Sequence, residues 1–181
     1  MRTSSVAKEY AKALFLMAKH LGKIDQIEED LEEFTRLAEK NKAINNFLLA
    51  PQLSAETKKE TLGKALKGKV DNDLFRFLIV LIEKRRQDCL AEIYASYRDE
   101  LNKYYNRLEV FIESAVDLTD TERETLISKL SGHLKRKILF RSKVNPGLLG
   151  GLVCRIGDVV YDGSIRRRLE RLSSQMLKAK I

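Results

Sequence analysis

The sequence has few residues that interrupt helices and no apolar segment long enough to span a membrane. Its 181 residues include only two prolines, which is compatible with long helices. No uninterrupted apolar run approaches the ~20 residues that cross a bilayer, and the N-terminal region lacks the apolar stretch of a signal peptide. We therefore expect a protein that is cytosolic or bound to a membrane only peripherally.

The sequence also lacks the spacings that mark metal and redox sites. Its two cysteines, Cys89 and Cys154, are far apart, and neither belongs to a Cys-x-x-Cys pair. His20 and His133 have no Cys, Asp or His partner at the spacing of a metal ligand set. We expect buried reduced thiols, histidines at the surface or in helix packing, and no bound metal.

Common catalytic and nucleotide-binding motifs are missing as well. Ser164 does not lie in a Gly-x-Ser-x-Gly sequence, so a helix cap explains it better than a nucleophile. The glycines between Gly147 and Gly151 are not followed by the Lys-Ser/Thr pair of a phosphate-binding P-loop. We therefore expect neither an enzyme nor a cofactor.

Positive charge is concentrated in the C-terminal part of the chain. Residues 1–105 contain 19 Lys/Arg and 17 Asp/Glu, a balance of +2, whereas residues 106–181 contain 15 and 9, a balance of +6. Such a surface favours acidic partners, which can be protein, nucleic acid or anionic lipid. A basic nucleic-acid-binding protein is therefore the alternative hypothesis, although no zinc finger, helix-turn-helix or aromatic RNA-binding motif is present.

Residues 1–105 are predicted to form a bundle of six amphipathic helices. Apolar residues recur at helical spacing, as in Ile24, Ile27, Leu31, Phe34 and Ala38. The expected breaks lie at Gly22, near Asn41, at Pro51, at Gly68-Lys69 and at Gln87-Asp88. Short connections between such helices favour antiparallel packing in a compact N-terminal domain.

Residues 106–181 are predicted to form a small C-terminal α+β domain, so that the whole protein is mainly α with an α+β part. Leu108–Val116 is rich in Val, Ile and Phe and short enough for a strand. Thr119 and Glu122 form a capping-box pattern before a helix that ends near Lys135. The alternation in Lys137–Val144 indicates a second strand.

The segment that follows predicts a β-hairpin. Gly150 and Gly151 remove side chains where a strand must begin close to other backbone. Two short apolar runs, Leu152–Ile156 and Val159–Tyr161, are separated by Gly157-Asp158, a pair suited to a tight primed turn.

A final helix is predicted after this hairpin. Asp162 and Gly163 turn the chain, and Ser164 can cap the helix. Its apolar residues share one face, which we expect to pack within the domain: Ile165, Leu169, Leu172 and Met176.

This C-terminal run closely resembles the C-terminal motif of the delta subunit family of bacterial F-type ATP synthases, which is related to the mitochondrial oligomycin sensitivity conferring protein. The matching residues are Gly150, Gly151, Arg155, Gly157, Asp158, Asp162, Gly163, Ser164, Arg168, Leu169 and Leu172. The segment Tyr10–Phe15 is similar to the opening helix of the family, and the resemblance covers nearly the whole chain.

Two N-terminal helices are candidates for a binding groove. The segment Leu74–Ile82 is apolar on nearly every side, and Val6–Leu21 has a long apolar face. From the residues alone, both are better explained as core. The resemblance implies instead that the first and fifth helices receive the amphipathic N-terminal segment of an alpha subunit. The candidate residues are Tyr10, Leu14, Met17, Leu78, Val80 and Leu81.

The final helix is the second candidate surface. Arg167, Arg171 and Lys178 lie opposite its apolar face. The residues alone favour a solvated charged face. The resemblance implies that this basic face contacts the b subunits of the peripheral stalk.

The resemblance thus implies a noncatalytic stator subunit without cofactor or nucleic acid. Residues 1–105 would bind the catalytic head and residues 106–181 the peripheral stalk, on the cytoplasmic side of the bacterial membrane. Such a link holds the head still, so that ion-driven rotation is coupled to ATP synthesis.

Overall fold

The computed structural model describes residues 4–66 and 68–178, with side chains described as far as Gln175. The chain divides into two compact units, Met1–Leu101 and Asn102–Ile181, and each has its own apolar core. The described residues form eight α-helices and one four-stranded sheet, so the protein is mainly helical with a smaller α+β part. None of the described helices is long and apolar enough to cross a membrane.

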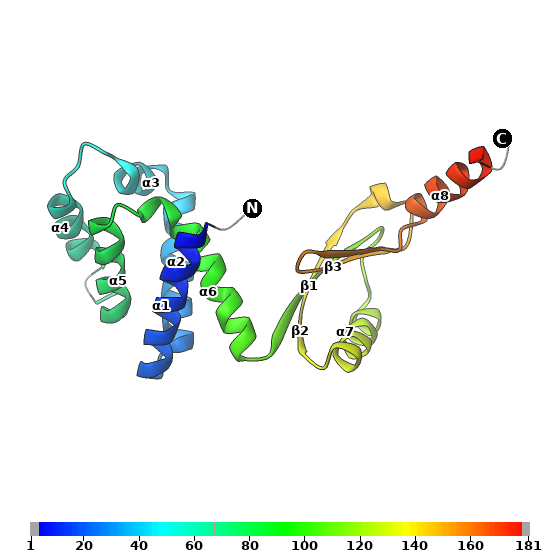
Figure 1. Cartoon of the computed structure of the whole chain (residues 1–181), viewed down its shortest axis with the longest axis horizontal. Coiled ribbons are helices and arrows are strands. Elements are labelled where there is room, and N and C mark those ends of the chain that lie inside the picture. The colour runs from blue at the N-terminus through cyan, green and yellow to red at the C-terminus, as the bar shows by residue number, and fades with distance from the viewer. Residues whose placement is uncertain (1–3, 67, 179–181) are drawn as a thin grey trace. The chain divides into compact units, whose positions relative to one another are not determined.

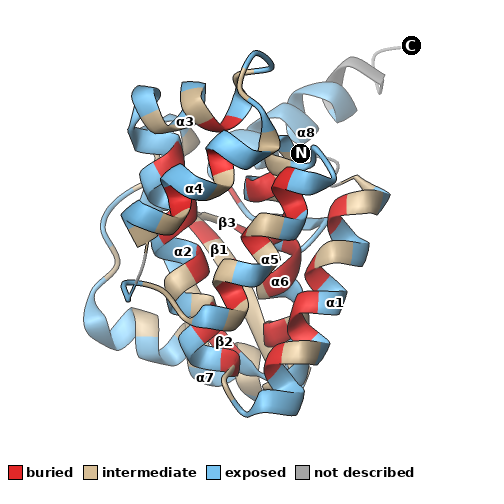
Figure 2. Ribbon diagram, turned by 90° about the vertical axis from the view of Figure 1, so that its left-hand side faces the viewer, coloured by how far each residue is buried: buried red, intermediate tan, exposed pale blue. Residues whose placement is uncertain are grey.

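Six α-helices account for most of the described first unit (Figure 1), and each of them contains buried residues (Figure 2). They are α1 (Ser5–Leu21), α2 (Ile24–Lys40), α3 (Lys42–Leu49), α4 (Ala55–Leu66), α5 (Asn72–Glu83) and α6 (Leu90–Tyr104), with a 3₁₀ turn η1 (Gln87–Cys89) before α6.

The ends of these helices follow from local residues. Gly22 adopts the left-handed conformation that ends α1. The side chain of Asn41 accepts hydrogen bonds from the Ala43 and Ile44 amides and so begins α3. The breaks predicted at these two residues are confirmed.

The centre of the first unit is built around a buried tyrosine. Tyr97 of α6 is fully buried, and its hydroxyl donates to the Ile24 carbonyl at 3.0 Å. The Phe15 ring of α1 meets the Tyr97 ring edge to face, with the centroids 5.7 Å apart. This residue therefore joins α1, α2 and α6 while its only polar group remains hydrogen-bonded.

The second unit is a four-stranded sheet with one helix packed on it. Its elements are β1 (Arg107–Ser114), α7 (Asp120–Leu134), β2 (Lys137–Val144), the 3₁₀ turn η2 (Pro146–Leu148), β3 (Leu152–Ile156), β4 (Val159–Asp162) and α8 (Ile165–Lys178). The strand order is β2-β1-β3-β4. The β1–β2 pair is parallel and is connected through α7, and the other two pairs are antiparallel.

The core of the second unit lies between this sheet and α7. Val110 and Ile112 of β1 are fully buried, beside Ile138 and Cys154. Leu126, Ile127, Leu130 and Leu134 pack against them from α7. The capping box at Thr119 and Glu122 is present, so this helix is confirmed together with its predicted start.

The predicted hairpin is confirmed too. Ile156 pairs with Val159 across Gly157 and Asp158, and Gly157 has a φ of 57°. A two-residue primed turn needs this left-handed conformation, which glycine adopts without steric cost.

Candidate interaction surfaces

Helices α1 and α5 lie side by side in the first unit (Figure 1). The rings of Tyr10 and Phe77 meet edge to face, with the centroids 6.3 Å apart. At the other end of the pair, the Lys23 ammonium contacts Asp71 at 2.9 Å and Asp73 at 3.1 Å, which ties the α1–α2 turn to the start of α5. The two helices therefore run in opposite directions.

The Lys23 contact sets the electrostatics at the start of α5. Its hydrogen bond lowers the pKa of Asp71 below the ordinary value of a carboxyl group and raises the pKa of Lys23. Asp71 also accepts the Asp73 amide at 2.8 Å as the N-cap of α5. The Asp71 carboxylate thus caps the start of α5 and also pairs with Lys23.

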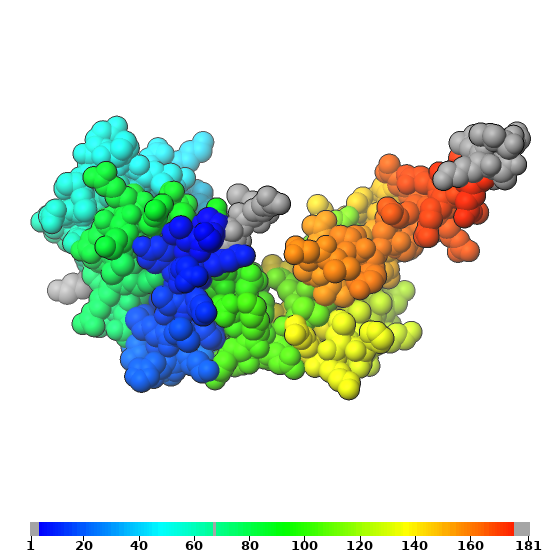
Figure 3. All heavy atoms as spheres, in the orientation of Figure 1, coloured from blue at the N-terminus to red at the C-terminus, as the bar shows by residue number. Residues whose placement is uncertain are grey.

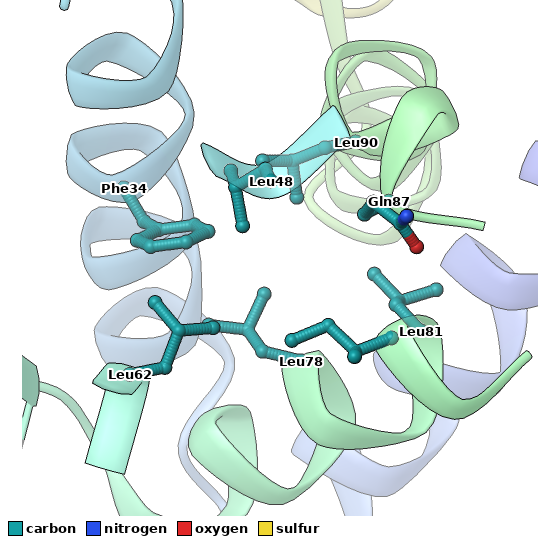
Figure 4. A pocket seen from close by; sticks show the side chains of 8 residues that line it. Phe34, Leu48, Leu62, Leu78, Leu81, Gln87 and Leu90 are labelled. Atoms are coloured by element: carbon teal, nitrogen blue, oxygen red, sulfur yellow. The ribbon is translucent and has the colours of Figure 1, made fainter. Parts of the chain in front are cut away.

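Three of the six predicted groove residues point into the core. Leu14, Leu78 and Leu81 are between 1% and 3% exposed. Leu78 and Leu81 line a small apolar cavity of about 10 Å³, together with Phe34, Leu48, Leu62, Ile82, Gln87 and Leu90 (Figure 4). These leucines pack in the core beneath the exposed faces of α1 and α5, and they cannot touch a ligand unless the unit rearranges.

The other three predicted residues lie nearer the solvent. Tyr10 and Met17 are half-buried on α1, and Val80 of α5 is 40% exposed. Phe77, which the prediction omitted, is half-buried and contacts Tyr10. The sequence could have identified Phe77, because it lies three residues before Val80 and residues three apart share a helix face. We call Tyr10, Met17, Phe77 and Val80 the α1/α5 surface.

The apolar side of α8 does not pack within its unit, so this prediction was wrong. Ile165, Leu169 and Leu172 are 47–53% exposed, and no residue from Ile165 to Gln175 is buried. The side chain of Met176, the fourth residue of the predicted face, lies outside the described part. The reason is geometric, because only the first turn of α8 approaches the rest of the unit. The remainder of the helix extends beyond the sheet (orange to red in Figures 1 and 3).

The motif that precedes α8 fixes this first turn. A Cβ on Gly150 would come within 2.5 Å of the Ile165 side chain, and one on Gly151 within 2.4 Å of the Gly163 carbonyl oxygen. Ile165 donates its amide to the Gly150 carbonyl at 3.0 Å. The absence of a side chain at these two glycines therefore allows the segment before β3 to approach Gly163 and the start of α8 closely.

Two side chains cap the same turn. The Ser164 hydroxyl accepts the Arg167 amide at 3.2 Å, so the predicted cap is confirmed. Asp162 accepts the Ser164 amide at 2.9 Å, and this hydrogen bond lowers the pKa of the Asp162 carboxyl. Asp158, by contrast, lies exposed in the hairpin turn.

The basic residues of α8 are exposed on the side away from its apolar face. Arg167 and Arg171 lie there, and Arg167 approaches Asp162 at 4.0 Å. Lys178 belongs to α8, but its side chain lies outside the described part. An open hollow of about 480 Å³ beside α8 is lined by Asp162, Gly163, Ser164, Ile165, Arg168, Arg171, Leu172 and Gln175. Apolar and basic groups therefore border one concavity.

The cysteines and acidic groups offer no reaction centre in the part of the chain described. Cys154 is buried, and burial raises the pKa of its thiol, which keeps it protonated. Cys89 is only half-buried, which corrects the expectation of two buried thiols. Among the residues with described positions, no three His, Cys, Asp or Glu side chains gather as a metal ligand set.

Solvent-facing apolar residues on α1 and α5 of the first unit and on α8 of the second are typical of a protein that binds other chains. A model of the ATP synthase delta (OSCP) subunit family matches residues 6–176. The chain is 34% identical to the ATP synthase subunit delta of Symbiobacterium thermophilum, over 99% of this chain and 96% of that protein. It is also 34% identical to that of Brevibacillus brevis, over 96% and 99%.

Among solved structures, a chain of the Toxoplasma gondii mitochondrial ATP synthase hexamer shares the fold. The TM-score is 0.71 at 21% identity, over 96% of this chain and 98% of that one. The chain belongs to the ATP synthase delta (OSCP) subunit family, whose members are noncatalytic stator subunits.

Proposed function

We propose that the chain links the catalytic head of a bacterial F-type ATP synthase to its peripheral stalk through two separate surfaces. The first unit, with α1 to α6 as one bundle, receives the N-terminal segment of an alpha subunit. The second unit, residues 106–181 in the sequence analysis, binds the b subunits. Both contacts lie on the cytoplasmic side of the membrane, where the protein is held peripherally through the complex.

The observation that carries the head contact is the α1/α5 surface. Tyr10, Met17, Phe77 and Val80 are apolar and incompletely buried on two antiparallel helices in contact. An amphipathic helix binds such a surface through apolar side chains one turn apart. Leu14, Leu78 and Leu81 then have an indirect role, because they hold α1 and α5 at the distance that the ligand requires.

A charge on this surface tests the head contact. Val80→Glu should weaken binding of a synthetic alpha N-terminal peptide at least about tenfold, because the new carboxylate would have to be desolvated. Val80 is exposed, so helix content and melting temperature should hardly change. Titration calorimetry measures the affinity.

Leu16→Glu is the matched control. Leu16 is 55% exposed on α1 and lies roughly a third of a turn around the helix from Tyr10 and Met17. It should leave the peptide affinity unchanged. Equal losses from the two substitutions, or none from Val80→Glu, would rule out the α1/α5 surface.

The stalk contact rests on the unpacked side of α8. Its apolar stripe would be covered by a partner helix, which supplies affinity, while the arginines favour an acidic partner and set its register. This assigns Ile165, Leu169 and Leu172 a larger role than Arg167, Arg171 and Lys178, which the sequence analysis proposed as the contact.

Two substitutions separate these contributions. Leu169→Glu should weaken b-subunit binding strongly at all salt concentrations, because it removes apolar burial. The Arg167→Glu, Arg171→Glu double variant should weaken binding less, and only at low salt. Val116→Glu, at an exposed apolar residue of the same unit, is the control. Full binding by Leu169→Glu would eliminate α8 as the stalk contact.

These two contacts explain how a protein without a reaction site serves ATP synthesis. Ion flow turns the rotor, and the rotor tends to carry the head with it. A chain that binds head and stalk at once resists this torque. The head then stays still while the rotor turns, and the rotation alters the conformation of the catalytic sites instead of carrying the whole head round.

A further inference from the structure

A second hollow of the first unit lies around the connection between α3 and α4. Its volume is about 310 Å³, and it includes none of the residues of the α1/α5 surface. The lining residues are Leu49, Ala50, Pro51, Gln52, Leu53, Ser54, Ala55, Lys58, Ile82, Arg85 and Gln87. The described lining contains two cationic side chains and no carboxylate. We call this hollow the α3–α4 pocket.

Lys58 is the unusual residue of this pocket. It is only 4% exposed, and its ammonium donates to the Leu48 carbonyl at 2.7 Å. This bond connects the end of α3 to α4, and the dipole of α3 favours a cation there. A carbonyl uses one of three ammonium protons, however, and does not neutralise the charge. A buried cation in this position favours an anion beside it.

Two further features restrict the kind of anion. Leu49, Leu53 and Ile82 give the pocket an apolar wall, which suits an organic group better than an inorganic ion. The Gln87 Oε1 atom is buried and has no hydrogen-bond partner among the described residues, so turning this side chain toward the pocket would let it accept an N–H or O–H group. Gln87 lines both this pocket and the small apolar cavity (Figure 4).

We propose that the α3–α4 pocket binds a carboxylate that carries an apolar side chain and an amide N–H, as at the C-terminus of a polypeptide or in an N-acyl amino acid. The carboxylate lies against Lys58 and Arg85, and the apolar group lies against Leu49 and Leu53. The N–H donates to Gln87 once that side chain has turned its Oε1 atom into the pocket. The N-terminus of α4, which begins at Ala55 directly after Ser54, adds a favourable helix dipole. This site is independent of both contacts proposed above.

The test uses the full chain with labelled Leu and Ile methyl groups and two probes of the same shape. N-acetyl-L-leucine has the carboxylate, whereas N-acetyl-L-leucinamide is neutral. The acid should shift the Leu53 and Ile82 methyl signals with a dissociation constant of about a millimolar, as expected for so small a ligand. The amide should bind at least about tenfold more weakly, because charge-assisted hydrogen bonds are lost.

Variants then assign the residues. Lys58→Met should remove the preference for the acid while keeping the apolar stem. Arg85→Gly should also weaken acid binding without lowering the melting temperature, because Arg85 has a φ of 53° that glycine adopts freely. Lys84→Ala, one residue earlier and outside the pocket, should bind as the original chain does. Arg85→Gly keeps the test decisive if Lys58→Met does not fold.

A longer peptide ending in leucine identifies the source of the ligand. Tighter binding than N-acetyl-leucine would assign the pocket to a polypeptide C-terminus, and equal binding to a small organic acid. Equal shifts from acid and amide, no methyl shifts from either, or undiminished acid binding by Arg85→Gly would overturn the proposal. Peptide binding at the α1/α5 surface is unaffected by any of these outcomes.

Discussion

Helices α5 and α8 have similar apolar patterns and opposite environments. Leu74, Leu78 and Leu81 of α5 are buried, whereas Leu169 and Leu172 of α8 are about half exposed. Each set recurs at intervals of three or four residues. Such spacing therefore indicates that a helix has an apolar side, but it does not indicate whether its own chain or another chain covers that side.

The surroundings of the two helices explain the difference. In the first unit other helices surround α5. Its Leu78 and Leu81 line the small apolar cavity together with Phe34 and Leu62. The second unit has one described helix, α7, on its core, and that core is already filled by Val110 and Ile112. The unit still exposes apolar side chains such as Val116, Leu149 and Tyr161, but no residue from Ile165 to Gln175 is buried against them, which leaves the apolar side of α8 available to a partner.

The largest expected effect tests this difference directly. Leu78→Ala should lower the free energy of unfolding of the first unit by about 2–5 kcal/mol, because it enlarges a cavity in a packed core. Leu169→Ala should change the stability of the isolated chain by less than about 0.5 kcal/mol, because the side chain is already half hydrated. Urea denaturation followed by circular dichroism measures both. Comparable losses would mean that α8 is packed in solution.

The next effect concerns the attachment of α8. Gly151→Ala should destabilise the second unit by about 1–3 kcal/mol, because Gly151 has a φ of 75° and a Cβ would meet the Gly163 carbonyl. Gly132→Ala is the matched control within α7, where a Cβ meets nothing within 4 Å. That change should stabilise the unit by about 0.5–1 kcal/mol. A neutral Gly151→Ala would show that α8 is not held by this backbone contact.

Local signals in the sequence predicted most of the elements. The capping box at Thr119, the turn at Gly157-Asp158 and the cap at Ser164 each depend on neighbouring residues, and each is present. The parallel pairing of β1 with β2 could not be derived in this way, because it joins strands separated by a whole helix.

The candidate sites were less predictable because burial depends on packing between distant segments. Leu78 and Val80 lie two residues apart in one apolar run, yet one is buried and the other exposed. The difference depends on where α1, α2 and α4 meet α5. In the sequence Lys58 likewise resembles any lysine on a helix surface. Its burial follows from the position of the end of α3, where its ammonium donates to the Leu48 carbonyl.

The smallest expected effect compares how the two helices begin. Asp71 and Asp162 both have lowered pKa values, so each contributes stability above the unfolded pKa of about 4 and loses it as the pH falls through the folded value. The Asp71 side chain is 8% exposed and that of Asp162 is 26% exposed, so solvent screens Asp71 less. Acidification from pH 6 to about pH 3 should therefore destabilise the start of α5 more than that of α8.

Asparagine variants isolate this contribution. Asp71→Asn should reduce the acid-induced loss of stability in the first unit, and Asp162→Asn should have a smaller effect in the second. The measurement is the urea midpoint of each unit at the two pH values, followed by amide signals from α5 and α8. Since Lys23 has a raised pKa, its side of the contact persists until alkaline pH, so only the carboxylate responds in this range. An unchanged pH dependence in Asp71→Asn would show that α5 is held by its buried leucines alone, and the difference between the two helices would then rest on packing.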